Sequence, residues 1–279
     1  MSAGLDLILP DWIGAPENVG AFATGRRGGV SQAPFDDGSG SGNGGLNLGA
    51  YVDDDANAVA QNRELLRRKL PSEPVWLKQV HGNTVVDAAR IKRALDGAHP
   101  MPQQGLFKDR QKDAKSPVLA DASFTATPGV VCAVTTADCL PVLLTDTAGK
   151  VVAAAHAGWR GLAGGILQQT VGAMQAAGAG PLLAWMGPAI GPAHFEVGQD
   201  VFTVLVERDA RADAAFRRIP GKEGKYLADL YHLARLILAD CGVIRIAGGR
   251  FDTVGDGKRF YSYRRDNRTG RMASLIWIS

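Results

Sequence analysis

Three apolar runs in this chain end on a residue that binds soft metals or acts as a nucleophile. The runs lead to His81, Cys139 and His156, and the whole chain contains only five histidines and three cysteines. Short apolar runs rich in β-branched residues are typical of buried strands. A fold that brings the ends of these strands together places one thiol and two imidazoles side by side.

One thiolate and two imidazoles form a three-ligand zinc site whose fourth position stays open, which is the pattern of catalytic rather than structural zinc. Copper(I) also suits this donor set. The alternative is two hydrogen-bonded core histidines and a buried thiol without a metal. Asp138, the residue before Cys139, is predicted to orient a ligand or to move a proton.

The bulk composition excludes several classes of protein. The chain has 279 residues, of which 46% are hydrophobic and 21% charged, and its formal net charge is +3. This charge is too small to indicate a nucleic-acid or membrane partner. An odd number of cysteines argues against a disulfide framework, and neither a signal peptide nor a membrane span is recognisable. We therefore expect a cytoplasmic protein with small-molecule partners, either a monomer or a weak homodimer.

Strand and helix patterns are mixed along the chain without regular alternation. This favours an α+β fold, a single domain over residues 1–279 with mixed β-sheets flanked by helices. Strands are predicted within 20–31, 75–80, 129–144, 150–155 and 182–186 and in the C-terminal tail, and helices over 161–177, 199–208 and 228–240 and up to residue 70 after a cap at Asp54 or Asp55. A Gly/Ser-rich loop over 37–45 and a long polar surface excursion over 88–117 interrupt these elements.

A glycine-rich turn after His156 carries Arg160 and Gly161 and leads into a predicted helix. The first N–H groups of a helix are unpaired, so such a turn favours an anion such as phosphate. Arg26 and Arg264 also lie in turn-like contexts where a guanidinium could bind phosphate or a carboxylate, as do Arg265 and Arg271. The alternative is that the glycines only permit a tight turn and the arginines are ordinary surface residues.

Ordered motifs along nearly the whole chain resemble one known family, the YfiH-type laccase-domain proteins. This family is also described as multicopper polyphenol oxidase-like or purine nucleoside phosphorylase-like. The matching segments include Arg26–Ser31, Leu46–Gly49, Trp76–Gly82, Ala120–Thr125, Thr136–Pro141, His156–Gly161, Gly187–Pro192, Phe195–Gly198, Ser262–Asp266 and Thr269–Ala273.

The resemblance implies that the family's metal ligands fall on His81, Cys139 and His156. It implies phosphorolysis of adenosine, inosine and methylthioadenosine, and deamination of adenosine. Copper-dependent oxidation of phenols and a role in correcting peptidoglycan precursors are also attributed to the family. We place Arg26, Asn47, Arg160, Gly161 and Arg264 in the substrate and phosphate site. The loops over 37–45 and 88–117 look like insertions that could reshape the cleft.

Several mechanisms are compatible with these residues. Laccase chemistry needs several coppers and many histidines, so five histidines argue against it. Zinc deaminases also need a proton-shuttling carboxylate, for which Asp138, Asp121 and Glu196 are candidates. A metal-free cysteine hydrolase acting on peptidoglycan precursors, with Cys139 as nucleophile and His156 or His81 as base, is the main alternative. A non-enzymatic binding module is a third. A zinc-dependent purine nucleoside enzyme is the function that we predict.

Overall fold

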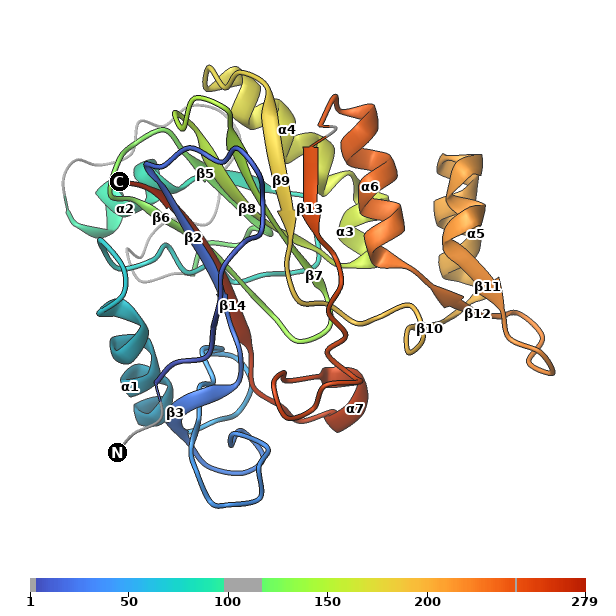
Figure 1. The fold of residues 1–279 in the computed structure, drawn as a ribbon, viewed down its shortest axis with the longest axis horizontal. Helices are drawn as coiled ribbons and strands as arrows, with labels where there is room; N and C mark the ends of the chain where they lie inside the picture. Colours follow the sequence, from blue (N-terminus) through green and yellow to red (C-terminus); the bar gives the residue numbers. More distant parts are fainter. Residues whose placement is uncertain (1–3, 98–116, 244) are drawn as a thin grey trace.

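The computed structural model describes residues 4–97, 117–243 and 245–279. An antiparallel four-stranded sheet and a mixed six-stranded sheet pack face to face (Figure 1). The four-stranded sheet contains, in spatial order, β1 (Leu7–Ile8), β2 (Val19–Thr24), β14 (Met272–Ile278) and β6 (Val131–Thr136). The six-stranded sheet contains β13 (Arg245–Gly248), β9 (Leu182–Met186), β7 (Leu140–Asp146), β8 (Val152–Ala157), β5 (Ala122–Thr125) and β4 (Val85–Asp87).

Alternation along the central strands explains the layers. In β7 and β8, Leu144 and Ala153 face a core shared with helices, whereas Leu143 and Val152 face the core between the two sheets. Successive side chains of a strand point to opposite faces, so a strand that is apolar throughout is buried on both sides. This explains why β7 and β8 read as continuous apolar runs in the sequence.

Helices cover the two outer faces of the sheet pair. The described helices are α1 (Ala56–Arg67), α2 (Ala88–Leu95), α3 (Trp159–Gly164), α4 (Ile166–Ala176), α5 (Gln199–Arg208), α6 (Leu230–Asp240) and α7 (Tyr263–Asp266), with a 3-10 helix η1 (Ala210–Ala215). Leu66 of α1 packs on the four-stranded sheet, and Leu167 of α4 and Leu238 of α6 pack on the six-stranded sheet. The order of layers is therefore helix, sheet, sheet, helix.

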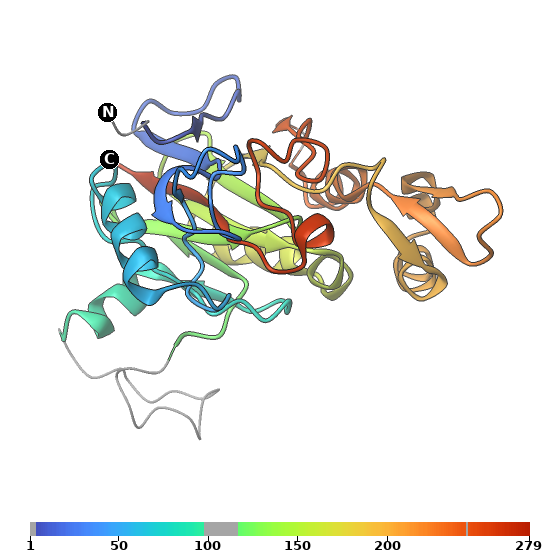
Figure 2. The ribbon, with the colours of Figure 1, turned by 90° about the horizontal axis from the view of Figure 1, so that it is seen from below.

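A third, small sheet forms a lobe at one side of the molecule (Figure 2). It consists of β10 (Glu196–Gly198), β12 (Lys225–Ala228) and β11 (Phe216–Arg218) in that order, and α5 lies beside it. Phe202 of α5 stacks on Tyr226 of β12 with ring centroids 4.4 Å apart, and this pair gives the lobe its own apolar contact. The remaining short strand, β3 (Arg27–Ser31), lies beside α1.

The predicted α+β class with mixed sheets is confirmed, and most predicted elements are present. Asp55 caps α1 by accepting a hydrogen bond from the Asn57 amide at 2.7 Å. The predicted strand over 75–80 is wrong in part, because only isolated bridges form there. The predicted helix over 161–177 is two helices, since Gly165 adopts φ 88° and breaks the hydrogen-bond pattern. In the tail, α7 replaces the first of two predicted strands.

The predicted surface excursion over 88–117 requires a correction at its start. Residues 88–95 form α2, and Ala88, Ala89 and Ile91 are buried. Asp87 caps this helix by accepting from the amides of Ala89 and Arg90, a signal that the basic composition of the segment concealed. Residues 98–116 of the predicted excursion lie outside the described residues.

The lengths and compositions of the helices bear on whether they could cross a membrane. Within the described part of the chain, none of them combines the length and the apolar character that a crossing requires.

Candidate metal centre

Four adjacent strands of the six-stranded sheet begin or end at the same edge, and each delivers one residue to a common site. Cys139 precedes β7, His156 lies at the end of β8, Asp121 precedes β5, and His81 lies in the loop before β4. β8 runs antiparallel to β7 and β5, and β4 runs parallel to β5. The topology therefore gathers residues that lie up to 75 positions apart in the sequence.

Strand register places Cys139 and His156 on the same face. Pro141 pairs with His156 and Leu140 with Ala157, so Cys139 is the next residue outward, opposite Gly158. Diagonal neighbours in an antiparallel pair share a face and approach closely. The two side chains therefore point toward the core between the sheets.

Three possible ligand atoms, one each from His81, Cys139 and His156, lie within 4.8 Å of one another. The two imidazole rings meet edge to face, with centroids 4.8 Å apart. Tetrahedral zinc with bonds of about 2.0–2.3 Å needs ligand atoms roughly 3.3–3.7 Å apart, so the side chains need to close by only about 1 Å. His81 is exposed, Cys139 half-buried and His156 buried, so the ion would be open on one side. The donor set and its spacing fit zinc.

Asp121 holds both histidines in place from behind. Its Oδ1 accepts a hydrogen bond from His156 Nδ1 at 2.8 Å and from the His81 amide at 2.9 Å. Its Oδ2 accepts from the Gly82 amide at 2.7 Å and the Val80 amide at 3.2 Å. A carboxylate that accepts the Nδ1 proton leaves Nε2 of the histidine available to a metal. Three consecutive amides around one carboxylate also hold His81 at its left-handed φ of 60°.

The side chains around Cys139 favour its ionised form. Burial raises the pKa of this thiol, but the charge of His156 and hydrogen bonds from His156 and His81 lower it to about 6. Burial lowers the pKa of His156, but the Cys139 thiolate and Asp121 raise it to about 9. Both shifts favour a thiolate–imidazolium pair, and a metal ion would displace the proton on that pair when it binds.

Gly158 leaves the space that the sulfur occupies. A Cβ atom at this position would lie 2.8 Å from Cys139 Sγ, closer than real Cβ atoms come. The backbone of Gly158, with φ −65° and ψ 166°, is one that any residue adopts, so the restriction comes from the sulfur alone. The glycine after His156 is thus explained by the thiol on the neighbouring strand.

Asp138 lies next to the site but has both oxygens engaged within the protein. Its Oδ1 accepts from the Thr253 hydroxyl and its Oδ2 from the Arg264 amide, both at 2.6 Å. Its φ of 96° is rare for a residue with a side chain, and it lies where the apolar run over 129–144 divides into β6 and β7. Each oxygen thus accepts one hydrogen bond within the protein and keeps a second acceptor position. Asp138 therefore connects the loop of Cys139 to the segment that carries Arg264.

Two residues of the predicted phosphate site lie inside the fold. Arg26 is buried, and its three guanidinium nitrogens donate to the Asp36 carbonyl, the Asp36 carboxylate and the Gly257 carbonyl. Asn47 is fully buried, donates to Asp54 at 2.8 Å and accepts from the Arg271 amide at 2.8 Å. Both side chains thus stabilise the fold, and their assignment to the phosphate site stays a prediction.

The other predicted phosphate residues lie at the ligand edge. Arg160 is exposed on α3, two residues after Gly158, with its guanidinium 4.6 Å from the Trp159 ring centroid. Gly161 lies one residue further on and is buried against the carbonyls of His156 and Gly82. Arg264 is exposed and donates to the Glu196 carbonyl at 2.8 Å. Arg160 thus comes to this edge with the segment after His156. Arg264 comes with a segment more than 100 residues later, whose backbone bonds to Asp138.

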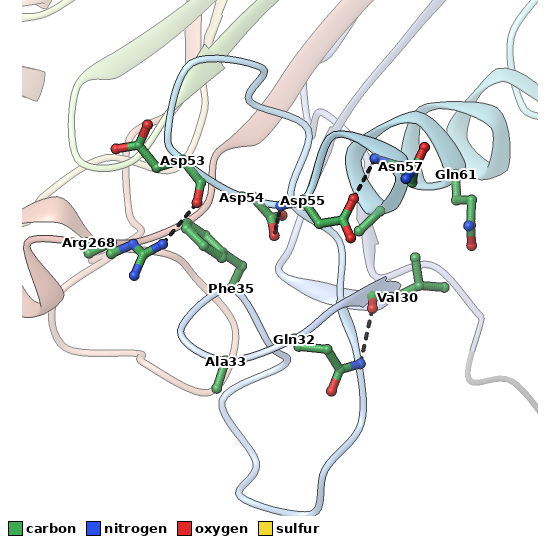
Figure 3. A pocket seen from close by; sticks show the side chains of 11 residues that line it. Val30, Gln32, Ala33, Phe35, Asp53, Asp54, Asp55, Asn57, Gln61 and Arg268 are labelled. Carbon is green, nitrogen blue, oxygen red and sulfur yellow. Dashed lines mark hydrogen bonds between the residues drawn. The ribbon is translucent and has the colours of Figure 1, made fainter.

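One cavity of about 410 Å³ lies elsewhere, beside the start of α1 (Figure 3). Arg268 extends over the Phe35 ring there and donates to the Asp53 carbonyl at 2.9 Å. None of the three predicted ligands lines this cavity, and it is therefore not the predicted site.

Two further residues contribute to the centre, and the sequence marks them only weakly. Asp121 is one of three candidate carboxylates in the sequence, and its position directly before an apolar strand, like that of Cys139, is the signal that favours it. Arg271 is one of several arginines in turn-like contexts. The structure places its half-buried guanidinium close enough to Cys139 and Asp138 for their charges to raise its pKa, although burial has the larger, lowering effect.

Comparison with known proteins identifies the family of this chain. Residues 20–279 match the family model described as "Multi-copper polyphenol oxidoreductase laccase". A purine nucleoside phosphorylase of Pseudomonas aeruginosa is 48% identical over 272 residues, which cover 97% of this chain and 98% of that protein. The purine nucleoside phosphorylase YfiH of Escherichia coli is 46% identical over 274 residues, which cover 98% of each chain.

Solved structures share the fold. A Neisseria meningitidis protein superimposes with a TM-score of 0.81 at 45% identity, covering 98% of this chain and 99% of that one. YlmD of Geobacillus stearothermophilus gives a TM-score of 0.76 at 29% identity, covering 94% and 92%. With its three-ligand centre and its whole-length similarity to YfiH, the chain belongs to the multi-copper polyphenol oxidoreductase laccase family, in the YfiH-type group of purine nucleoside phosphorylases.

Proposed function

We propose that this protein is a zinc-dependent purine nucleoside phosphorylase acting on adenosine, inosine and methylthioadenosine. The observation that carries the proposal is its whole-length similarity to relatives named as purine nucleoside phosphorylases. The clustered His81, Cys139 and His156 support it, because they would hold the ion at an open edge of the sheet. Copper(I) would suit the same ligands. The partners are then a nucleoside and phosphate, and we keep a monomer or weak homodimer as the proposed assembly.

The chain's own residues would prepare the metal centre. Asp121 keeps the proton of His156 on Nδ1, so Nε2 points to the ion. The low pKa of the Cys139 thiol supplies a thiolate at neutral pH. When bound, zinc would supply Lewis acidity that polarises a substrate oxygen.

Arg160 and Arg264 are the proposed phosphate contacts. In phosphorolysis a phosphate oxygen forms a bond to the ribose C1′ while the bond from C1′ to the purine nitrogen breaks. The electron pair of that bond goes to the base, which takes up a proton. Two exposed guanidiniums at the ligand edge would hold the phosphate dianion in position and offset its charge. Gly161, packed against the His156 carbonyl, would let α3 lie close enough to present Arg160.

Adenosine deamination stays a prediction for the same centre. A zinc deaminase needs a carboxylate that moves protons beside the metal. Asp121 accepts four hydrogen bonds, which fill its acceptor positions, and Glu196 pairs with Lys222 at 2.8 Å on the small sheet. Asp138 accepts only one hydrogen bond on each oxygen, so it is the carboxylate that we propose for this proton transfer.

Product analysis tests the function directly. Purified zinc-loaded protein is incubated with adenosine, inosine or methylthioadenosine, with and without inorganic phosphate, and products are separated by liquid chromatography. We expect free base together with a ribose 1-phosphate ester, and only when phosphate is present.

The other products have distinct meanings. Base released without phosphate would indicate hydrolysis and would contradict the phosphorylase function, whereas inosine formed from adenosine would show the predicted deamination. No turnover of any of the three nucleosides would exclude the nucleoside function.

A further inference from the structure

Tyr263 presents an exposed aromatic ring on a backbone that is held on both sides. Its side chain is 56% exposed at the start of α7. Ser262 before it is fully buried and accepts a hydrogen bond from the Arg265 amide at 3.2 Å, and the Arg264 amide after it donates to Asp138 at 2.6 Å. A ring on a fixed backbone has few positions open to it, so less freedom is lost when a ligand binds than on a mobile loop.

The same hydrogen bond places Tyr263 beside the metal centre. Tyr263 precedes Arg264, and Cys139 follows Asp138, so each is one residue away from an end of the 2.6 Å bond. The register of β14 with β6 agrees, because Met272 pairs with Thr136 and the chain before it continues toward Asp138. The ring therefore belongs to the same sheet edge as the three ligands.

Arg271 occupies one side of the ring and links it to the thiol. Its Cζ lies 5.9 Å from the Tyr263 ring centroid. Its Nη1 donates to the carbonyls of Thr269 and Gly270 at 2.9 and 3.0 Å, which fixes the guanidinium. Cys139, Asp138 and Tyr263 are the charged or ionisable groups that interact with this cation. The Arg271 cation thus lies beside the Tyr263 ring and within reach of the charge on Cys139.

We propose that Tyr263 is a substrate-contacting residue on which the purine base stacks while the sugar faces the metal ligands. This inference rests on the proposed function, and it names the surface that recognises the base. Stacking uses the ring face and needs no hydroxyl group, so it selects planar heteroaromatic groups. The hydrogen bond from the Arg264 amide to Asp138 then positions the substrate indirectly, because it sets the position of the Tyr263 backbone relative to Cys139.

Steady-state kinetics of two variants test the proposal. For Tyr263→Ala we expect the KM for adenosine to rise about 5- to 150-fold, the range that corresponds to loss of one base–aromatic stack. The KM for phosphate and the zinc content should stay within about twofold of the wild type, because neither involves the ring. Tyr263→Phe should keep the wild-type KM for adenosine, since it keeps the ring.

Tyr51→Ala is the matched control. Tyr51 is 63% exposed and, like Tyr263, has a cation beside its ring, with Lys78 Nζ 5.3 Å from the centroid. We expect no change in the KM for adenosine. Unchanged adenosine KM in Tyr263→Ala, an equal rise in Tyr51→Ala, or a parallel rise in the KM for phosphate would overturn the stacking role.

Equilibrium binding separates this inference from the proposed function. If the wild type does not phosphorolyse adenosine but binds it by calorimetry, weaker binding by Tyr263→Ala alone still supports the stacking surface. If the wild type turns adenosine over and Tyr263→Ala is unchanged, the stacking role fails and the function stands. If the wild type neither binds nor converts adenosine, both are wrong.

Discussion

Cys139→Ser should remove zinc from the protein and abolish phosphorolysis. A serine hydroxyl does not ionise at neutral pH, so the site loses its thiolate and keeps only His81 and His156. Losing a residue behind a metal ligand typically costs 10- to 100-fold in affinity, so losing a ligand itself should cost more than about 100-fold. Metal analysis after desalting and the rate of base release measure the two effects. Cys241→Ser, at the end of α6, is the control and should retain both.

Thiol reactivity separates the metal site from a cysteine hydrolase. In metal-free protein, the Cys139 pKa of about 6 means that iodoacetamide should label this thiol rapidly at pH 7 and slowly below pH 6. Burial raises the pKa of Cys132 to about 12 and also raises that of Cys241, so these two are internal controls. Zinc should protect Cys139. A protein that never holds zinc and stays active in chelator would instead favour the hydrolase.

Asp121→Asn should lower zinc affinity about 10- to 100-fold. An asparagine amide group offers one acceptor oxygen where the carboxylate offers two, and its NH₂ faces N–H donors. The backbone amides around His81 and the Nδ1 proton of His156 then lose part of their acceptor. Unsatisfied buried donors cost about 1–3 kcal/mol, so the free energy of unfolding of the metal-free protein should also fall. Zinc titration and urea unfolding measure the two quantities.

Asp146→Asn is a matched control at the other end of the same sheet. Asp146 is 1% exposed and accepts from the amides of Lys150 and Val151 in the turn between β7 and β8. Both bonds reach Oδ1, an acceptor that asparagine keeps, so this variant should retain the zinc affinity and most of the stability of the wild type. Equal zinc affinities for Asp121→Asn and the wild type would show that Asp121 does not orient the ligands.

The clustered residues His81, Cys139 and His156 could be singled out from the sequence because their signal is local. Each ends an apolar run, and a chain with few histidines and cysteines leaves few other choices. The strand topology then brings the ends of the runs together. The order of the strands in the sheet cannot be read from any single run. The sheet edge that collects Cys139, His156 and Asp121 follows from pairings between strands that are distant in sequence.

The roles of the charged residues could not be predicted, because they depend on three-dimensional partners. Arg26 looks like a phosphate contact in the sequence, which does not reveal that it donates to the Asp36 and Gly257 carbonyls. Asp138 looks like a catalytic acid, and nothing near it in the sequence indicates its bonds to Thr253 and Arg264, more than 100 residues away. Local composition does not encode such contacts. The buried face of α2 could not be predicted for a similar reason. Basic residues dominate the composition of that segment, and its apolar residues are recognised only once the helix is known.

X-ray absorption at the zinc edge of the wild-type protein tests the metal centre most directly. If His81, Cys139 and His156 bind one ion, the spectrum should show one sulfur at about 2.3 Å, two imidazole nitrogens at about 2.0–2.1 Å and one further light atom. Zinc coordinated only by oxygen and nitrogen, or a protein that retains no zinc after equilibration, would contradict the three-ligand centre.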